Sequence, residues 1–351
     1  MFILKIIGLM SGTSCDGLDI ALCEFKHENN SFYYSILQTE FIPYLPNLRQ
    51  RLLNSIYLSA QDVTILETDF SNFCAARVIN FLNKYNLSAD YISSHGHTVF
   101  HNPRYGYSYQ IGNGEIIAKK TGIDCIYDFR SGDVALGGQG APLVPIGDYL
   151  LFNNYDACLN LGGFANISKK WFDTRIAYDI CPLNIVLNSL VFNLGLEYDD
   201  KGRIAATGKL INELFEALTN LHYYHQNPPK SLGKEWVTEN ITPIINKYLS
   251  HSLNDILYTY TIHAAMQITR NFDSNTNVLV TGGGAFNDFL IQQIERNTSA
   301  NLIFPSTELI IFKEAVIFAF LGYLRVNNIN NCLCSYTGAK RDSCCGSIAK
   351  A

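Results

Sequence analysis

A short stretch near the N-terminus, residues 11–17 (SGTSCDG), combines hydroxyls, glycines and an acid between two apolar runs. Small side chains leave backbone N–H groups uncovered, so such a turn can hold an anion such as a phosphate. It is not a Walker A loop, because no Gly-Lys-Ser/Thr follows and the next segment is predicted to be a strand. Asp16-Gly17 equally suits an ordinary hairpin turn, which is the alternative interpretation at this point.

Two later turns repeat this pattern. The apolar run 157–161 leads into Gly162 and Gly163, and the run 277–280 leads into Gly282, Gly283 and Gly284. Three such turns could hold the phosphates of one nucleotide and border its sugar and base, because glycine turns and helix N-termini offer N–H donors. This is the arrangement of the sugar kinase, actin and chaperone ATPase superfamily. The alternative is that α/β proteins often place glycine after a strand.

Two side-chain sets could carry other chemistry. Asp179 ends a predicted strand just before Pro182, where its carboxylate can act as a base or simply cap the next helix. His95, His97 and His101 include a His-x-His pair, which is a metal-ligand geometry on a strand and would indicate a metal-dependent hydrolase. The flexible Gly96 and the lack of a following carboxylate argue against that alternative.

Arg130 and Glu314 have both structural and functional interpretations. Arg130 lies near Asp128 and Asp133 in the sequence, so it could form a surface ion pair or a hydrogen-bond fork to a carboxylate or phosphate. Glu314 opens a predicted apolar helix, where an acid near the N-terminus is favourable by itself.

The elements that position these residues alternate between strands and helices. An antiparallel opening is predicted over 2–7, 18–25 and 31–37, and a long helix over 61–85. Short strands and helices follow, and a further helix is predicted over 313–325. The glycine-rich stretch 131–142 is predicted to be a boundary or hinge between two halves of the chain. We therefore expect a mixed α/β fold with domains at 1–135 and 136–334, and a C-terminal segment from about 335 to 351 packing back on the first.

Composition excludes several classes of partner. Hydrophobic residues make up 48% and charged residues 16% of the 351 residues, with a net charge of −5 and no basic stripe. We therefore expect neither nucleic acid nor a membrane as partner.

The N-terminus lacks the basic region of a signal peptide. Cysteines isolated in apolar strands indicate a cytoplasmic protein. A C-terminal group, Cys332, Cys334, Cys344 and Cys345, lacks C-x-x-C spacing, and its role stays open.

Motifs along nearly the whole chain carry a family resemblance. They are 8–19 (GLMSGTSCDGLD), 94–98 (SHGHT), 110–112 (QIG), 128–130 (DFR), 137–145 (GGQGAPLVP), 159–166 (LNLGGFAN), 198–208, 229–235 (PKSLGKE), 282–287 (GGGAFN), 313–319 (KEAVIFA) and 337–339 (TGA). The combination of SGTSxDG and GGQGAPLVP is specific. The chain resembles the anhydro-N-acetylmuramic acid kinase family.

The resemblance implies a two-domain actin-like (ribonuclease H-like) ATPase fold with a nucleotide cleft between the domains, and a homodimer. It implies hydrolytic opening of 1,6-anhydro-N-acetylmuramic acid and phosphorylation of O6 by ATP and Mg²⁺, in cell-wall recycling. Asp179 would be the general base, and Asp16 or Asp19 would lie near the metal. The implied residues are, for ATP, Gly12, Thr13, Ser14, Asp16, Gly17, Asp19 and the later glycine turns, and, for the sugar, Ser11, His97, Arg130 and Glu314.

The chain departs from the family pattern in three places. The base motif reads Asp179-Ile180-Cys181-Pro182-Leu183-Asn184, so a Thr and two glycines are replaced, while Asn188 stands where Asp is usual. His97 stands where Gln is usual. A catalytically altered sugar- or nucleotide-binding regulator with the same fold is therefore a further alternative.

Overall fold

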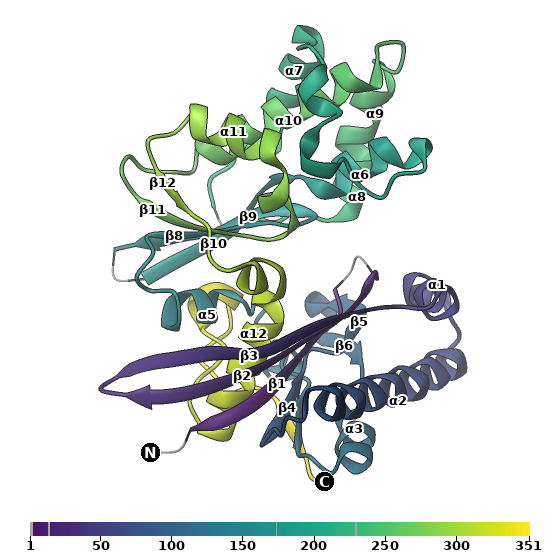
Figure 1. The fold of residues 1–351 in the computed structure, drawn as a ribbon, viewed down its shortest axis with the longest axis vertical. Coiled ribbons are helices and arrows are strands. Elements are labelled where there is room, and N and C mark those ends of the chain that lie inside the picture. Colours follow the sequence, from purple (N-terminus) through teal and green to yellow (C-terminus); the bar gives the residue numbers. More distant parts are fainter. Residues whose placement is uncertain (1–2, 13–14, 173, 229) are drawn as a thin grey trace. The chain divides into compact units, whose positions relative to one another are not determined.

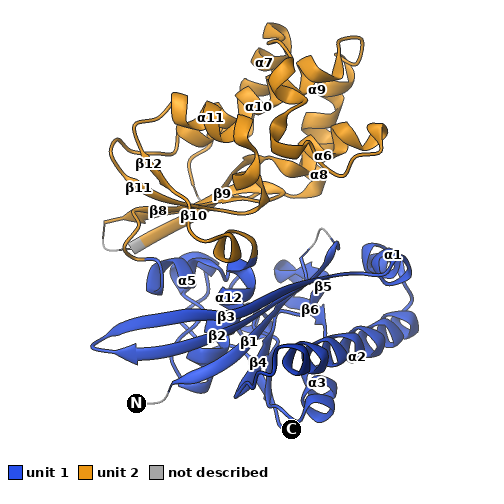
Figure 2. Ribbon diagram, in the orientation of Figure 1, with its two compact units in different colours: residues 1–152, 312–351 blue, residues 153–311 orange. Residues whose placement is uncertain are grey.

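The structure is a computed structural model that describes residues 3–12, 15–172, 174–228 and 230–351. The chain divides into two compact units (Figure 2). Unit 1 comprises Met1–Phe152 and Phe312–Ala351, and unit 2 comprises Asn153–Ile311. Helix α12 (Thr307–Val326) starts in unit 2 and continues into unit 1. Among the described residues, no helix has the length and apolar character needed to cross a membrane.

Unit 1 is built on a six-stranded sheet in the order β13-β7-β4-β1-β2-β3 (Figure 1). The first three strands form an antiparallel meander, β4 and β7 run parallel to β1, and β13 closes the edge antiparallel to β7. The strands are β1 (Leu4–Met10), β2 (Gly17–Glu28), β3 (Ser31–Pro43), β4 (Tyr91–Ser94), β7 (Cys125–Tyr127) and β13 (Ser347–Ala349). A separate two-stranded sheet joins β5 (His97–Asn102) to β6 (Tyr107–Ile111).

Alternating side chains of β1 give unit 1 two packed faces. Ile7 and Leu9 belong to the core that includes Leu66 and Phe70 of α2 (Ala60–Tyr85). On the other face, a Cβ on Gly8 would lie 1.9 Å from the carbonyl oxygen of Ala315, so glycine allows α12 to approach β1 closely. The remaining helices of unit 1 are α1 (Pro46–Leu53), α3 (Gly114–Thr121), α4 (Ser131–Ala135), α5 (Pro145–Leu150) and α13 (Cys334–Thr337).

Unit 2 repeats the same strand topology. Its sheet has the order β10-β9-β8-β11-β12, in which β8, β9 and β10 form an antiparallel meander and β11 and β12 run parallel to β8. The strands are β8 (Ala157–Leu161), β9 (Phe164–Trp171), β10 (Thr174–Pro182), β11 (Asn277–Thr281) and β12 (Asn301–Ile303). The helices are α6 (Asn184–Val191), α7 (Asn212–Thr219), α8 (Lys234–Trp236), α9 (Thr242–Asn246), α10 (Leu253–Thr269) and α11 (Asp288–Arg296).

In both units the strands therefore follow the order third, second, first, fourth, fifth. A meander with two parallel strands added beside its first strand is the ribonuclease H-like topology, and its duplication is the actin-like arrangement. The predicted mixed α/β fold class is confirmed.

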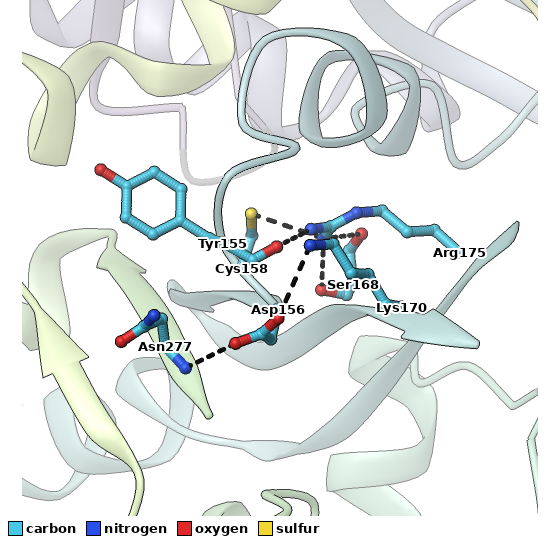
Figure 3. Close-up of polar contacts among 7 residues, drawn as sticks. All are labelled: Tyr155, Asp156, Cys158, Ser168, Lys170, Arg175 and Asn277. Carbon is cyan, nitrogen blue, oxygen red and sulfur yellow. Dashed lines mark hydrogen bonds and ion pairs between the residues drawn. The ribbon is translucent and has the colours of Figure 1, made fainter. Parts of the chain in front are cut away.

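Arg175 ties the meander of unit 2 together at one end (Figure 3). Its side chain on β10 is 2% exposed, and the guanidinium donates hydrogen bonds to the carbonyl oxygens of Ser168 (2.9 Å) and Tyr155. The nearby carboxylate of Asp156 accepts instead from the backbone N–H of Asn277, at 2.9 Å. The terminal nitrogens of the buried guanidinium are thus held by carbonyl groups rather than by a paired acid, while its Nε has no hydrogen-bond partner among the described residues.

The units divide at places other than the domain boundaries expected from the sequence, 1–135 and 136–334. Residues 136–152 belong to unit 1, and so do residues 312–334. The physical reason is packing, because the rings of Phe25 and Phe320 lie 5.4 Å apart and Ser93 donates a hydrogen bond to the carbonyl of Phe318 at 2.5 Å. Ile348 of β13 pairs with Ile126 of β7, so residues 347–349 belong to this sheet.

Candidate functional site

Unit 1 brings three carboxyl groups close together at the β1–β2 turn. Asp19 lies on β2 opposite Met10. Burial, together with the negative charges of Asp16 and Glu314, raises the pKa of Asp19 to about 7. Glu314 is in the interior of α12, because this helix begins at Thr307 and not near residue 313 as predicted. The favourable effect of an acid in a first helical turn therefore does not explain Glu314.

The turn itself is partly described. Thr13 and Ser14, predicted to contact ATP, lie outside the described residues. The carbonyl of Gly12 accepts from the N–H of Cys15 at 3.2 Å, and Asp16 accepts from the N–H of Gly17 at 3.0 Å. A Cβ on Gly17 would lie 2.5 Å from the carbonyl oxygen of Ile42 on β3, so the close approach of these strands requires glycine.

Ser11 and His97 support this turn from inside the protein. His97 is 3% exposed, with Nδ1 3.0 Å from the Ser11 hydroxyl and Nε2 3.7 Å from the Cys15 sulfur. The Tyr44 hydroxyl donates to the Ser11 oxygen at 2.7 Å. The structure thus places both predicted sugar-contact residues in a buried polar network under the turn.

His95 positions Arg130. His95 Nδ1 lies 2.9 Å from the carbonyl of Gly96, which can only accept, so Nδ1 carries the proton. Nε2 then accepts from the guanidinium of Arg130 at 2.8 Å, and Arg130 also donates to the carbonyl of Gly140 at 2.5 Å. Burial and the charge of Arg130 lower the pKa of His95 to about 3, so this imidazole is neutral.

This geometry answers the His-x-His alternative. Both ring nitrogens of His95 and of His97 already contact protein groups. Within the part of the chain that the structure describes, no group of three His, Cys, Asp or Glu side chains is arranged to hold a metal ion. The two histidines act as supports for Arg130 and for the turn, and nothing favours a hydrolase metal centre there.

Arg130 and Glu314 complete the unit 1 cluster. Burial raises the pKa of Glu314, while the positive charges of Lys313 and Arg130 act against this rise. Lys313 is paired at 2.7 Å with Asp148, and both side chains are buried. The charges of Asp16, Asp19, Glu314 and Arg130 therefore influence one another within unit 1, and Arg130 offers an oriented cation to an anionic ligand.

Unit 2 holds a single, separately oriented carboxylate. Asp179 lies on β10 at a bulge between Asp179 and Cys181. Its Oδ2 accepts from the N–H of Leu232 at 2.8 Å, and its carbonyl accepts from the Tyr223 hydroxyl at 2.7 Å. Burial raises the pKa of Asp179, whereas the hydrogen bond from Leu232 lowers it. Helix α6 begins at Asn184 with Leu183 at its N-cap, so helix capping does not explain Asp179.

The second and third glycine turns lie together in unit 2. A Cβ on Gly282, whose φ is +85°, would lie 2.8 Å from the backbone of Leu161, just before Gly162. Asn184 links the second turn to α6, because its N–H donates to the carbonyl of Gly162 at 3.3 Å and its amide donates to that of Leu161 at 3.0 Å. The sequence pattern thus identified two turns that are neighbours in space.

A pocket of about 350 Å³ opens beside the third turn. It combines backbone N–H groups, amides and aromatic rings, which suits a nucleoside with phosphates. Gly283, Gly284, Asn184 and Asn188 stand out in the sequence, and the two aromatic residues, Tyr198 and Phe286, lie in the motifs 198–208 and 282–287. The lining residues are Asn184, Leu187, Asn188, Tyr198, Asp199, Asp200, Lys201, Gly283, Gly284, Phe286 and Asn287.

The sequence reasoning missed two supports of Asp179. Leu232 and Tyr223 are far from Asp179 in the sequence, although Leu232 is part of the motif at 229–235. The motif at 229–235, which contains no side chain with an evident catalytic role, was the only indication in the sequence that Leu232 could matter. Tyr223 had no comparable signal.

A duplicated ribonuclease H-like topology with glycine turns beside strand ends defines the class of actin-like ATPases. Residues 4–351 match the family model described as anhydro-N-acetylmuramic acid kinase. The chain belongs to this family of sugar kinases. It is 35% identical to the anhydro-N-acetylmuramic acid kinase of Francisella tularensis subsp. novicida, over 97% of each chain. It is 33% identical to that of Synechococcus elongatus, over 98% of this chain and 99% of the relative.

Among solved structures, the chain is similar to the activator of the 2-hydroxyisocaproyl-CoA dehydratase from Clostridium difficile with bound ADPNP. The TM-score is 0.42 and the identity 13%, over 92% of this chain and 97% of that one. A likeness at this level supports no conclusion about ligand or activity.

Proposed function

We propose that this protein uses ATP and water to convert 1,6-anhydro-N-acetylmuramic acid into N-acetylmuramic acid 6-phosphate, with Asp179 as the general base. One observation carries this proposal. The carboxylate of Asp179 has Oδ2 fixed by the N–H of Leu232, while Oδ1 has no hydrogen-bond partner among the described residues. A carboxylate that is oriented through one oxygen can accept a proton from water through the other.

In the proposed reaction, water attacks the anomeric carbon of the sugar as the bond from that carbon to O6 breaks. The proton of the water moves to Asp179, and O6 takes the γ-phosphoryl group of ATP, so ADP leaves. Because O6 bonds to phosphorus and not to a proton, no second acid is needed. The raised pKa of Asp179 makes it a stronger base than an exposed aspartate.

For ATP, we propose the glycine turns as phosphate contacts and the pocket beside Gly283 and Gly284 for the nucleoside. The carboxyl groups of Asp16 and Asp19 fit Mg²⁺, because carboxylate oxygens are its preferred protein ligands. The raised pKa of Asp19 reports mutual repulsion and burial, which a bound cation would relieve. Mg²⁺ would offset the charge of the phosphates during transfer.

For the sugar, we propose that Arg130 binds the lactyl carboxylate and that Glu314 accepts a sugar hydroxyl. The neutral His95 holds one side of the guanidinium, and Arg130 Nε is buried without a hydrogen-bond partner among the described residues. A preoriented guanidinium binds a carboxylate with two parallel hydrogen bonds. Ser11 and His97 would contribute by holding the turn in shape.

An ADP-release assay tests the proposal. We expect ADP with 1,6-anhydro-N-acetylmuramic acid, and none with glucose, N-acetylglucosamine or a levoglucosan-type anhydro sugar. Mass spectrometry of the product should show the addition of one water and one phosphoryl group. If none of these sugars releases ADP, the protein is not a kinase of this substrate class, and the altered motif at Asp179 would then favour a binding regulator.

We also propose that the protein acts in the cytoplasm as a homodimer. All ten cysteines are present as thiols and eight are buried, which suits a reducing compartment. The family resemblance supports the dimer, and light scattering on the purified protein should give twice the mass of the chain.

A further inference from the structure

The C-terminal cysteines have no part in the proposed reaction, yet two of them are held together. Cys332 pairs with Ser343 in an antiparallel bridge, with N–H to carbonyl distances of 3.0 and 2.9 Å in the two directions. Asn331 clamps Cys345 from both sides, because its amide donates to the Cys345 carbonyl at 2.9 Å and its oxygen accepts from the Cys345 N–H at 2.7 Å. The backbone thus fixes Cys345 beside Cys332.

The two thiols lie close enough to influence each other's pKa. Cys332 and Cys345 form a side-chain hydrogen bond, and the Ser343 hydroxyl lies 3.1 Å from the Cys345 sulfur. These two partners, with Cys332 the stronger, lower the pKa of Cys345, while the bond to Cys345 and burial raise the pKa of Cys332. One sulfur of the pair therefore has thiolate character, and the other keeps its proton.

The other two cysteines of the tail differ. Cys344 lies 3.9 Å from the carbonyl of Arg325, and burial raises its pKa. A hydrogen bond to Asp342 raises the pKa of Cys334. Neither combines a neighbouring thiol with a lowered pKa, so both offer matched controls within the same segment.

We propose that Cys332 and Cys345 are a redox modification site that closes to a disulfide when the protein meets a peroxide. The Cys345 thiolate attacks one peroxide oxygen and the O–O bond breaks, so Cys345 becomes a sulfenic acid. The departing hydroxide takes up from solvent the proton that Cys345 had released and forms the first water. The Cys332 sulfur then attacks the Cys345 sulfur, its proton leaves with the hydroxyl as a second water, and the S–S bond forms. Two thiols are oxidised and one hydrogen peroxide is reduced to two waters.

The disulfide would act on the segment that carries Arg130. The Cys332 sulfur lies 3.7 Å from the carbonyl oxygen of Phe129, and its one thiol proton, which can be donated to this carbonyl or to the Cys345 sulfur, is lost on oxidation. The Cys345 sulfur lies 3.1 Å from the position that a Cβ on Gly132 would take, so it touches the chain on the other side of Arg130. We expect oxidation to raise KM for the sugar about tenfold and to change KM for ATP by less than about twofold. This expectation rests on the proposed role of Arg130 in binding the sugar.

Peptide mapping of the full-length protein tests the site without using turnover. The protein is treated with hydrogen peroxide, free thiols are alkylated, and the digest is analysed by mass spectrometry with and without dithiothreitol. We expect a reducible Cys332–Cys345 link in the wild type and in Cys344→Ser, and none in Cys332→Ser or Cys345→Ser. A link elsewhere, or sulfinic acid on Cys345 without any link, overturns the proposal.

Kinetics of the oxidised protein test the effect on Arg130. A rise in KM for the sugar that dithiothreitol reverses, and that Cys332→Ser abolishes, supports the coupling. An unchanged KM in fully linked protein overturns it. Failure of the reduced protein to turn over any sugar would refute the proposed function and leave the peptide map as an independent test of the thiol pair.

Discussion

Asp19 in unit 1 and Asp179 in unit 2 lie in meanders of the same topology, but their surroundings differ. Burial raises the pKa of both. Asp19 has two further acids nearby, Asp16 and Glu314, whose charges add to the rise. Asp179 has a backbone N–H from Leu232 that opposes it.

The difference shows how one strand topology can present two kinds of carboxylate. A group of acids without enough cations is stabilised by binding one, whereas a lone acid with one oxygen engaged is suited to exchange a proton. Asp16 is local to Asp19, while Leu232 reaches Asp179 from a distant loop.

The largest effect should come from Asp179→Asn. An amide cannot accept the proton of water as a base, so we expect kcat to fall by about 10³-fold or more, with the Kd of ATP unchanged by calorimetry. Asp273→Asn, at an exposed aspartate of the same unit, is the control and should keep full activity. Residual turnover within tenfold of the wild type would show that another group is the base.

Asp19→Asn should lower kcat by about 10²-fold, because one ligand of the proposed cation site loses its charge. The same substitution should raise the stability of the protein. The pKa of Asp19 is about 7 in the folded protein, so on raising the pH Asp19 loses its proton earlier in the unfolded chain than in the folded one. The wild-type aspartate therefore lowers the free energy of unfolding as the pH rises from about 4 to 7.

The free energy of unfolding of Asp19→Asn should therefore exceed that of the wild type by about 2 kcal/mol at pH 8, and the two should be equal at pH 3.5. The figure is half the energy that corresponds to the full pKa shift, because the carboxyl is only partly buried and solvent screens it. Denaturant unfolding at the two pH values measures this difference. A variant that is less stable at pH 8 would contradict the repulsion described above.

Tyr223→Phe should have an intermediate effect. The hydroxyl holds the carbonyl of Asp179, and Lys230 packs on the Tyr223 ring and donates to its carbonyl. Loss of this support should lower kcat about fivefold to tenfold and weaken the hydrogen bond from Leu232 to Asp179. Because that hydrogen bond lowers the pKa of Asp179, weakening it should raise this pKa and move the acidic limb of the pH–kcat profile to higher pH. A lower kcat with an unmoved limb would indicate a merely structural effect.

The smallest effect should come from His97→Gln. The glutamine side chain offers one acceptor and one set of donors, so it can replace the contacts to Ser11 and Cys15, and KM for ATP should change less than about threefold. His97→Leu is the matched variant that leaves Ser11 without this partner. It should lose about 1–3 kcal/mol of stability in thermal or denaturant unfolding. Equal behaviour of the two variants would refute a polar role for His97.

The sequence predicted the parts of this molecule that depend on local pattern. The N-terminal meander and the glycine turns after β8 and β11 follow from alternation and turn chemistry. The predicted strand end at Asp179 is wrong, because β10 continues past a bulge at this residue to Pro182. It misassigned the start of α12 because this helix is apolar nearly all round and offers no amphipathic face to place it. The supports of Asp179 and the burial of His97 depend on contacts between distant segments, which periodicity does not encode.

The pairing of β13 with β7 has a consequence for how the chain is made. Unit 2 is one continuous stretch, 153–311, so it can fold on the ribosome once it has emerged. The edge of the unit 1 sheet is completed only when Ile348 pairs with Ile126, and all of unit 2 is translated between these two residues. Strand β7 therefore keeps an open edge while unit 2 is translated, and a chain that stalls in this interval exposes that edge to aggregation.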